Sequence, residues 1–321
     1  MKFLEDLPVC QPPLWSRGGH TQTLLGYLLP SPSLEEAGER WAVELGDGDQ
    51  LIGRVHETAG ARVVHLLFHG LAGDTESSYI RRSVQLARKM GATSVRMNLR
   101  SAGEGIDAAK SFYHAGRASD VGVVVRAARS RWPGARVIVS GFSMSGNILL
   151  NLLGRGSVED LPDGAFVVNP SINLQATSAR LERGLNRLYD WRFIRDLLAM
   201  LERKRSLGMS IPEMERVPRT VYEFDELLTS RVAGFRDARH YYKECSSAPH
   251  VGAIRTPTLV LTASEDPFVP VEDFHSAAWS GAVRLRIERH GGHLGYLSRG
   301  RLRWLDQATE AAWVSLLRDL R

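Results

Sequence analysis

Short apolar runs alternate with amphipathic segments along most of the chain. Two strand-like runs, 41–45 and 51–57, flank a Gly-Asp-Gly-Asp turn, which is typical of a hairpin. Continuous apolar or β-branched runs predict further strands that are covered on both faces. These runs are 63–68, 93–98, 136–140, 165–168, 256–263 and 283–289.

Segments with helical periodicity lie between these runs, at 77–90, 120–131 and 147–153, and a last one at 302–320 closes the chain. Alternating strands and helices, with strands that are apolar throughout, indicate an α/β protein. We therefore expect a mostly parallel central sheet with helices on both faces. In such sheets, ligands bind at the carboxyl ends of the strands.

The strand pattern disappears between residues 171 and 249, where amphipathic segments such as 181–200 replace it. This change predicts a helical cap, inserted between two parts of one core at 1–170 and 250–321. Within the first part, residues 1–40 form an N-terminal arm. Its prolines and paired glycines predict an irregular path, followed by a short apolar segment.

A serine lies at a predicted bend between a strand and a helix. The strand-like run 136–140 is followed by Gly141-Phe-Ser143-Met-Ser145 and then by a helix-like segment. The order strand, sharp turn and helix is typical of a nucleophile elbow, in which the next N–H, from Met144, points at a reacting oxygen. The usual Gly-x-Ser-x-Gly pattern is incomplete, because Ser145 stands at its last position. An ordinary turn with Ser143 as a helix N-cap is the alternative.

A serine nucleophile needs a base, and the base needs an acid that orients it. In this kind of fold the chain order is serine, acid, histidine, and Ser143, Asp266 and His293 follow that order, each in a loop after a predicted strand. Glu265 competes with Asp266 for the role of the acid, and His290 competes with His293 for the role of the base.

The second donor of an oxyanion hole should come from the loop after the strand at 63–68. The N–H of Leu71 is the predicted donor, because His69-Gly70 gives the backbone room to turn inward. The alternative for His69-Gly70 is a glycine-bearing turn next to a histidine that serves only packing.

Composition excludes several function classes. The 321 residues carry a formal charge of +5 that is spread along the chain, and no basic cluster is interleaved with aromatics, so nucleic-acid binding is not expected. No apolar run approaches the ~20 residues of a membrane span. Two distant cysteines suit a reducing cytoplasm, and the N-terminal residues do not resemble a signal peptide. No cofactor or metal is expected, since the histidine pairs 65/69 and 290/293 have no third ligand in suitable spacing and no phosphate-binding glycine loop occurs.

These motifs together resemble the YheT-like branch of the α/β-hydrolases, which includes bacterial esterases and eukaryotic abhydrolase-domain lipases and acyltransferases. The resemblance covers nearly the whole length. It rests on Pro12-Pro-Leu-Trp15, Gly19-His-Thr-Gln-Thr23, His69-Gly-Leu-Ala-Gly73, Asn98-Leu-Arg-Ser-Ala-Gly103, Tyr113-His-Ala-Gly116, Gly141-Phe-Ser-Met-Ser-Gly-Asn147, Glu223-Phe-Asp225, Gly234-Phe235, Tyr241-Tyr242, Glu265-Asp-Pro-Phe268 and Gly291-Gly-His-Leu-Gly295.

The resemblance implies an α/β-hydrolase fold and a Ser143–Asp266–His293 triad that hydrolyses carboxylic esters or transfers the acyl group to an alcohol. Ser145 departs from the family, which generally has glycine there, and we expect this small residue to be tolerated. Matching motif positions imply that some residues line or brace the substrate pocket. They are His20, His69, Gly70, Arg100 and His114.

A helical cap over an apolar groove suits medium or long acyl chains, so the expected substrate is a small-molecule or lipid ester. A transient contact of the arm or the cap with a membrane surface is a further hypothesis. The alternative from another class is a non-catalytic binding module, whose elbow Ser145 has distorted.

Overall fold

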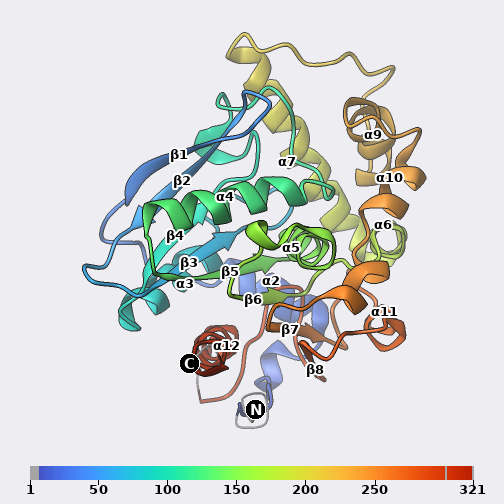
Figure 1. Cartoon of the computed structure of the whole chain (residues 1–321). Coiled ribbons are helices and arrows are strands. Elements are labelled where there is room, and N and C mark those ends of the chain that lie inside the picture. Colours follow the sequence, from blue (N-terminus) through green and yellow to red (C-terminus); the bar gives the residue numbers. More distant parts are fainter. Residues whose placement is uncertain (1–6, 301, 320–321) are drawn as a thin grey trace.

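The computed structural model describes residues 7–300 and 302–319. Within these residues one eight-stranded sheet forms, in the order β1-β2-β4-β3-β5-β6-β7-β8 (Figure 1). β1 and β2 are antiparallel, as are β2 and β4, whereas all pairs from β4 to β8 are parallel. The strands are β1 Glu39–Glu44, β2 Gln50–His56, β3 Val63–Phe68, β4 Thr93–Met97, β5 Arg136–Phe142, β6 Gly164–Val168, β7 Thr258–Ala263 and β8 Val283–Glu288.

Helices cover both faces of this sheet, which confirms the predicted α/β class. α4 (Ala118–Arg131) and α5 (Met144–Arg155) cover one face, and α3 (Ser78–Lys89) and α12 (Trp304–Asp319) cover the other (Figure 1). Strand β3 shows why its sequence is apolar apart from His65. Leu66 belongs to the hydrophobic core under α4 and α5, and its neighbour Leu67 belongs to the core under α3 and α12. The last residue of the helix predicted at 302–320 lies outside the described residues.

The arm differs from its prediction. Residues Gly19–Leu28, which include the end of the expected irregular path and the start of the short apolar segment, form helix α2. The reason is tertiary: α2 packs closely on a loop near the other end of the chain, as described below. Residues 1–6, on which the reading of the N-terminus partly rests, lie outside the described residues.

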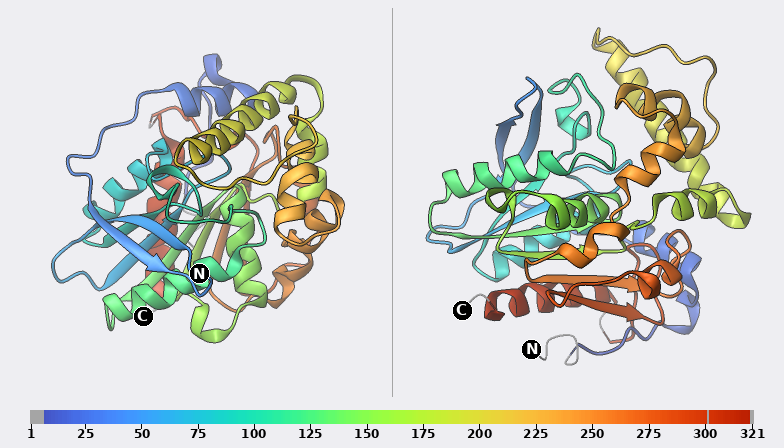
Figure 2. Two further views of the ribbon diagram at one scale, coloured as in Figure 1. Left: turned by 90° about the horizontal axis from the view of Figure 1, so that it is seen from above. Right: turned by 45° about the vertical axis from the view of Figure 1, so that its right-hand side comes forward.

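The segment between β6 and β7 carries helices over the carboxyl ends of the strands (Figure 2). We call residues 171–249 the cap, and its boundaries remain a prediction. The helix expected at 181–200 is divided, because α6 ends at Leu181 and α7 begins at Arg187. The regular elements of the cap are α6 Leu174–Leu181, α7 Arg187–Ser206, α8 Val221–Phe224, the π-helical turn η5 Asp225–Thr229, α9 Ser230–Val232 and α10 Ala238–Cys245, and α11 Val271–Ser276 follows β7.

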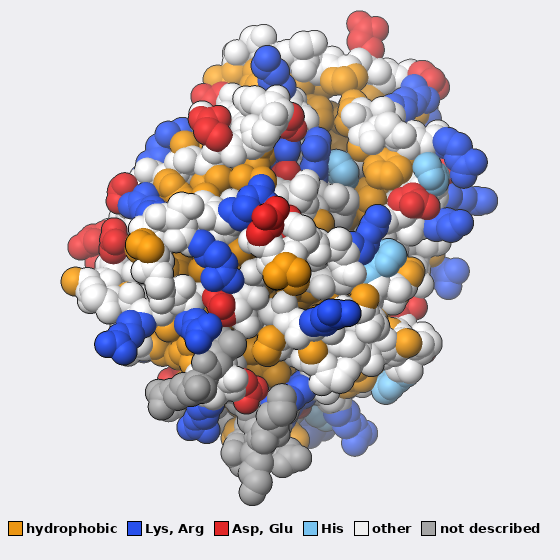
Figure 3. All heavy atoms as spheres, in the orientation of Figure 1, with side chains coloured by type: hydrophobic (Ala, Val, Ile, Leu, Met, Phe, Trp, Pro, Cys, Tyr) orange, Lys and Arg blue, Asp and Glu red, His pale blue; other side chains and the backbone are white. Residues whose placement is uncertain are grey.

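Among the described residues no helix is both long and apolar enough to cross a membrane. Basic and acidic side chains are mixed over the face shown in Figure 3. Both cysteines, Cys10 and Cys245, are buried and free. The cytoplasmic location stays a prediction.

Candidate active site

Ser143 lies at the bend between β5 and α5, in a backbone conformation that is rare for a residue with a side chain. Its φ is 55° and its ψ is −119°. The turn requires Gly141, because a Cβ atom there would lie 2.7 Å from the carbonyl oxygen of Ser145. Strained backbone of this kind persists only where its surroundings fix it. Here the N–H of Ser143 donates to the carbonyl of Val168 on the neighbouring strand (2.8 Å).

A chain of hydrogen bonds connects Ser143 to His293 and Asp266. The Ser143 hydroxyl lies 2.7 Å from His293 Nε2, and His293 Nδ1 lies 2.9 Å from Asp266 Oδ2. The two competitors from the sequence bind each other instead, since His290 Nδ1 lies 3.0 Å from Glu265 Oε1. The structure therefore brings Asp266 and His293, rather than their neighbours, to the serine.

The carboxylate of Asp266 is fully buried, and each of its oxygens accepts hydrogen bonds. Oδ1 accepts from the N–H groups of Phe268 (2.8 Å) and Val269 (3.1 Å), and Oδ2 accepts from the side-chain amide of Asn169 (2.7 Å) besides His293. Donors on every side hold the carboxylate in one orientation. Asn169 is a site residue that was not predicted, although it lies at the end of a predicted strand, before Pro170.

Helix α2 holds the loop that carries His293. The hydroxyl of Thr23 accepts a hydrogen bond from the His293 N–H (2.8 Å) and donates to the carbonyl of Gly19 (2.7 Å). A Cβ atom on Gly295 would lie 2.0 Å from the carbonyl oxygen of Gln22, so helix and loop touch backbone to backbone. The arm thus belongs to the machinery that positions the histidine.

Two residues that line the cavity together with Ser143 have unpaired backbone N–H groups. Met144 is the first residue of α5, so its N–H has no acceptor within the helix. The N–H groups of Gly70 and Ala72 are both held by tyrosine hydroxyls, at 2.9 and 3.0 Å. The N–H of Leu71, between them, makes no hydrogen bond to any described residue. An unpaired pair of donors next to a nucleophile is what an oxyanion hole requires.

Ser145 occupies the position where the elbow pattern has glycine. Its hydroxyl donates a hydrogen bond to the carbonyl oxygen of His69. This bond connects the first turn of α5, which carries Met144, to the loop that carries Leu71. The substitution therefore adds a link between the two candidate donors and leaves the distance between Ser143 and His293 at 2.7 Å.

Comparison with known proteins assigns the chain to a family. Residues 66–304 match the family described as "Alpha/beta hydrolase family". The chain belongs to the α/β-hydrolase family. It is 31% identical over 266 residues to "Putative esterase YheT" of Escherichia coli, which covers 79% of this chain and 77% of the relative, so the YheT-like resemblance is confirmed.

Two further comparisons support the same placement of this hydrolase. "Phospholipase ABHD3" of Homo sapiens is 28% identical over 316 residues, covering 92% of this chain and 76% of the relative. Among solved structures, the Pyrococcus furiosus esterase Pf2001 matches with a TM-score of 0.60 over 90% of this chain and 96% of its own, at 15% identity. That likeness shows the α/β-hydrolase fold alone.

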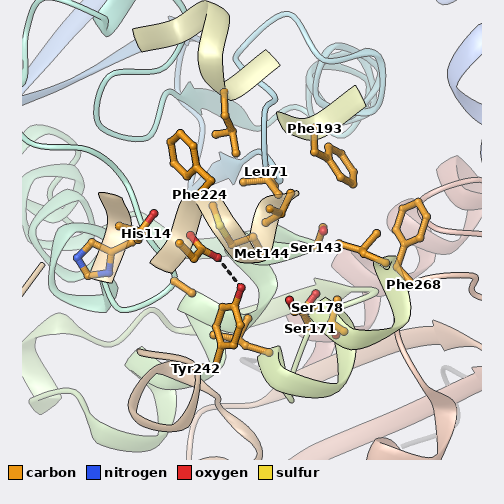
Figure 4. Close-up of a pocket in the computed structure, with 18 of the residues that line it drawn as sticks. Leu71, His114, Ser143, Met144, Ser171, Ser178, Phe193, Phe224, Tyr242 and Phe268 are labelled. Carbon is orange, nitrogen blue, oxygen red and sulfur yellow. Dashed lines mark hydrogen bonds between the residues drawn. The ribbon is translucent and has the colours of Figure 1, made fainter. Parts of the chain in front are cut away.

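A cavity of about 90 Å³ lies between Ser143 of this hydrolase and the cap (Figure 4). It is smaller than the roughly 300 Å³ of a typical ligand site. Its catalytic end is formed by Ser143, His293, Leu71 and Met144. The remaining lining comes from the loops after β4 and β6, from the loop that carries Phe268, and from the cap: Tyr113, His114, Ala115, Ser171, Leu174, Thr177, Ser178, Leu181, Phe193, Leu197, Val221, Phe224, Asp225, Thr229, Tyr241, Tyr242 and Phe268.

Of the residues predicted to line or brace the substrate pocket, His114 lines this cavity. Gly70 lies directly beside Ser143, since a Cβ atom there would be 3.0 Å from Ser143 Cβ. His69 is fully buried beneath the loop: its Nδ1 lies 2.8 Å from the Gly70 carbonyl oxygen, and its Nε2 accepts from the Leu99 N–H (3.1 Å). His69 therefore braces the loop. Burial lowers the pKa of His69, and it lowers that of His114 to about 3, so both rings are neutral at pH 7.

Arg100, which was predicted to line or brace the substrate pocket, lies outside the cavity. Its guanidinium is buried and surrounded by carboxylates, and it does not line the cavity. It forms ion pairs with Asp120 (2.6 Å), Asp47 (2.6 Å) and Asp49 (2.8 Å). A guanidinium with three carboxylate partners has little capacity left for a ligand. Arg100 instead fastens the β1–β2 hairpin and α4 to the loop after β4.

His20 braces the site from outside the cavity. Its ring stacks on Tyr189 of the cap, with 5.8 Å between the ring centres. Tyr189 packs edge-on against Phe268, and Phe268 packs against the imidazole of His293, each at 4.6 Å. A row of rings thus runs from the arm across the cap to the histidine beside Ser143.

The described residues contain no group of three His, Cys, Asp or Glu side chains that could hold a metal ion. His65, which belonged to the metal alternative, is fully buried and stacks on Trp313 at 3.9 Å. Burial lowers its pKa to about 3. His65 is therefore a neutral core residue.

Proposed function

We propose that this hydrolase cleaves carboxylic esters through an acyl-enzyme formed on Ser143. The observation that carries the proposal is the hydrogen-bonded chain Ser143–His293–Asp266, which ends in a cavity beside two unpaired N–H groups. Such an arrangement activates a hydroxyl that is otherwise a poor nucleophile. The alternative of a non-catalytic binding module needs a distorted elbow, and the 2.7 Å contact between Ser143 and His293 argues against distortion.

In the first step, the Ser143 oxygen forms a bond to the ester carbonyl carbon while its proton passes to His293 Nε2. The negative oxygen that results accepts hydrogen bonds from the N–H groups of Leu71 and Met144. The bond from carbon to the alcohol oxygen then breaks, and the His293 proton leaves with the alcohol. Asp266 stabilises the protonated imidazole throughout.

In the second step, water gives a proton to His293 and its oxygen forms a bond to the acyl carbon. The bond from that carbon to the Ser143 oxygen then breaks, His293 returns the proton to this oxygen, and the free acid leaves. An alcohol in place of water would give acyl transfer, because both reactions share the same acyl-enzyme. Product analysis in water with added alcohol separates the two. We propose hydrolysis as the main reaction, and a new ester as the dominant product would assign acyl transfer.

The test of the function is ester hydrolysis by purified wild type and Ser143→Ala. Wild type should hydrolyse activated esters, and Ser143→Ala should lose on the order of 10⁴-fold or more in kcat. Equal rates for both proteins would contradict the proposal.

We propose a medium or long acyl chain, because six leucine, valine and phenylalanine side chains of the cap line the cavity. The cavity holds only about 90 Å³, so such a chain requires the cap helices to move outward. A series from butyrate to decanoate esters should show kcat/KM rising with chain length. A series that favours butyrate would assign a short acyl group and a cap that stays closed.

We further propose that the arm and the start of α7 contact an anionic lipid surface. Exposed apolar side chains gather there, and the two segments are joined, since Arg192 of α7 donates to the Tyr27 hydroxyl of α2 at 2.9 Å. Exposed aromatic and leucine side chains beside arginines are typical of surfaces that bind at a lipid interface. The apolar side chains are Leu14, Trp15, Leu24, Tyr27, Leu28, Leu185, Leu188 and Trp191, and the exposed arginines are Arg17, Arg183, Arg187 and Arg195.

Sedimentation with vesicles tests this contact. Binding should be stronger to phosphatidylcholine mixed with phosphatidylglycerol than to phosphatidylcholine alone, and Leu28→Ser with Trp191→Ser should weaken it. Val217→Ser is a matched control, because Val217 is equally exposed but lies in the cap beyond the end of α7. Binding that ignores the lipid charge, or that falls equally in the control, would contradict the proposal.

A further inference from the structure

The loop after β3 carries the N–H of Leu71, the candidate oxyanion donor, and it closely approaches Ser143. A Cβ atom on Gly70 would lie 3.0 Å from Ser143 Cβ. Leu71, Ser143 and Met144 line the same cavity (Figure 4). A backbone N–H stabilises a negative oxygen only when it is held ready at the place where that oxygen forms. The contacts that fix this loop therefore decide whether Leu71 can serve as a donor.

Two tyrosine hydroxyls hold the loop, one on each side of Leu71. The Gly70 N–H donates to the hydroxyl oxygen of Tyr79 (2.9 Å), and the Ala72 N–H donates to that of Tyr113 (3.0 Å). The Leu71 N–H between them has no hydrogen-bond partner among the described residues. The protein thus uses the two outer N–H groups itself and leaves the middle one for a ligand.

The peptide unit between Gly70 and Leu71 is also held at its carbonyl end. The Gly70 carbonyl oxygen accepts from the Gly73 N–H (3.1 Å) and lies 2.8 Å from His69 Nδ1. A peptide unit is planar and trans, so its N–H points away from its C=O. These bonds fix the direction of the Leu71 N–H, provided that the residues at either end of the unit stay in place.

Ala72 shows why a bond from Tyr113 is needed. Its φ of 56° lies in the left-handed region, which costs free energy for a residue with a Cβ atom. Backbone of this kind persists only where neighbouring groups hold it. Tyr113 holds the N–H of this strained residue. We therefore expect the loop to relax, and the adjacent Leu71 N–H to turn, when the Tyr113 hydroxyl is removed.

Tyr79 connects the same loop to the strand that ends at Ser143. Its ring packs against Phe142, the residue before Ser143, with 4.8 Å between the ring centres. Its hydroxyl interacts with the Ser77 side chain besides the Gly70 N–H. The position of Tyr79 is thus tied to the elbow itself.

A buried lysine of the cap anchors the segment that carries Tyr113, residues 98–117 between β4 and α4. The side chain of Lys204, on α7, is fully buried. Its ammonium group donates to three oxygen atoms of that segment: Ser101 Oγ (2.7 Å) and the carbonyl oxygens of Ile106 (3.2 Å) and Ala109 (2.5 Å). Because Arg100 fastens the same segment to the core, Tyr113 extends from a rigid base.

We propose that Tyr79 and Tyr113 are positioning residues of the candidate oxyanion hole. Each hydroxyl oxygen holds a backbone N–H beside Leu71, so that the Leu71 N–H stays unpaired and directed at the negative oxygen of the intermediate. The inference rests on the proposed function and adds two residues to its machinery. Through Lys204, the cap contributes to the same arrangement.

Tyr79→Phe and Tyr113→Phe remove the hydroxyls and keep the rings. Loss of a whole oxyanion donor lowers kcat by about 10²–10³-fold, so a loosened donor should cost part of this, about tenfold in each variant. KM for the same activated ester should change by less than about twofold, because a positioning role affects the transition state and not substrate binding. A loss confined to KM, or an unchanged kcat in both variants, would overturn the inference while the ester hydrolysis of wild type stands.

Inhibition by a trifluoromethyl ketone with a hexyl chain reports on the donor more directly. The Ser143 oxygen forms a bond to the ketone carbon, the Ser143 proton passes to His293, and the ketone oxygen becomes negative. The inhibition constant should rise in each variant by about the factor by which kcat falls. An unchanged inhibition constant beside a reduced kcat would contradict the positioning role.

Thr93→Val is the matched control. The buried hydroxyl of Thr93, on β4, accepts from the Thr58 N–H (3.1 Å), and Thr93 does not line the cavity. Its removal also leaves a backbone N–H without its acceptor, but far from the loop of Leu71. Its kcat should equal that of wild type. A loss as large as in the tyrosine variants would overturn the inference, because reduced stability alone would then explain it.

Hydrogen exchange at single backbone amides tests the positioning role without catalysis. Tyr79→Phe should speed exchange of the Gly70 amide about tenfold, and Tyr113→Phe should do the same for the Ala72 amide. Faster exchange at these amides would support the inference even if wild type hydrolysed no ester. Unchanged exchange at both would contradict it.

Discussion

The catalytic end of the cavity and its cap wall are constructed differently. At the catalytic end, the acid has a partner on every side, and the loop of His293 touches helix α2 through backbone atoms. On the cap side, the cavity is lined by side chains, and the buried hydroxyl of Thr177 has no partner among the described residues. We therefore propose that the core and α2 fix the positions of the candidate triad, and that substrate selectivity depends on side chains of the cap.

The largest expected effect comes from replacing His293, and the neighbouring His290 serves as the comparison. His293→Gln should reduce kcat by about 10⁴-fold, because the Ser143 proton then has no acceptor. His290→Gln should change kcat little, since His290 pairs with Glu265. Steady-state kinetics of both variants on one activated ester make the measurement. Comparable losses in the two would show that the sequence competitors had been assigned wrongly.

Gly295→Ala tests the backbone contact between α2 and the histidine loop. The added Cβ would lie 2.0 Å from the Gln22 carbonyl oxygen, so helix and loop have to separate. We expect a loss of about 1–3 kcal/mol in the free energy of unfolding and a strong loss of activity. Gly281→Ala is the control, because a Cβ there meets nothing within 4 Å. Normal stability and activity of Gly295→Ala in denaturant titration and ester assays would refute the close contact.

Thr23→Val removes the hydroxyl that accepts from the His293 N–H and keeps the side-chain shape. Leaving that N–H unpaired should cost about tenfold in kcat, with a small change in KM, because the loop and not the substrate site is affected. Thr23→Ser should restore most of the rate. A change confined to KM would assign Thr23 to substrate binding.

Ser145→Gly restores the usual elbow pattern but breaks the bond to the His69 carbonyl. We expect kcat to fall about threefold, the value of one weakened neutral hydrogen bond. Ser145→Ala should behave in the same way, because the hydroxyl and not the Cβ makes the contact. A rise in kcat for Ser145→Gly would mean that Ser145 impairs the elbow.

The smallest effect concerns the cap. Burial, with a contribution from Asp190 on α7, raises the pKa of Asp225 from 3.8 to about 6, although hydrogen bonds from Thr229 and Tyr242 act against this. The neutral form is therefore favoured by folding, and wild type loses that stability as the pH rises from 3.8 through about 6.

The asparagine of Asp225→Asn cannot ionise. The melting temperature of this variant minus that of wild type should therefore be a few degrees higher at pH 7.5 than at pH 4. Thermal melts of both proteins at the two pH values make the comparison. A difference that does not depend on pH would contradict the raised pKa.

The sequence was sufficient for the sheet and for the candidate triad, because each residue follows a strand whose apolar pattern is local. It was insufficient for α2, because the prolines of the arm and the paired glycines at 18 and 19 favoured an irregular path. That helix depends on Gly292 and Gly295, some 270 positions away along the chain, as the Thr23–His293 contact shows.

The ion pairs of Arg100 could not be predicted for a similar reason. Its partners Asp47, Asp49 and Asp120 come from other elements, and the sequence gives no sign that they meet. The unpaired hydroxyl of Thr177 could not be predicted from the sequence, because an unpaired hydroxyl can be recognised only when all its neighbours are known.

Labelling with a fluorophosphonate probe tests the central claim most directly, because the probe reacts with activated serines. We predict that the purified protein is labelled at Ser143, identified by peptide mapping, and that Ser143→Ala is not labelled. Labelling of a folded wild-type protein at another serine, or no labelling at all, would contradict the account.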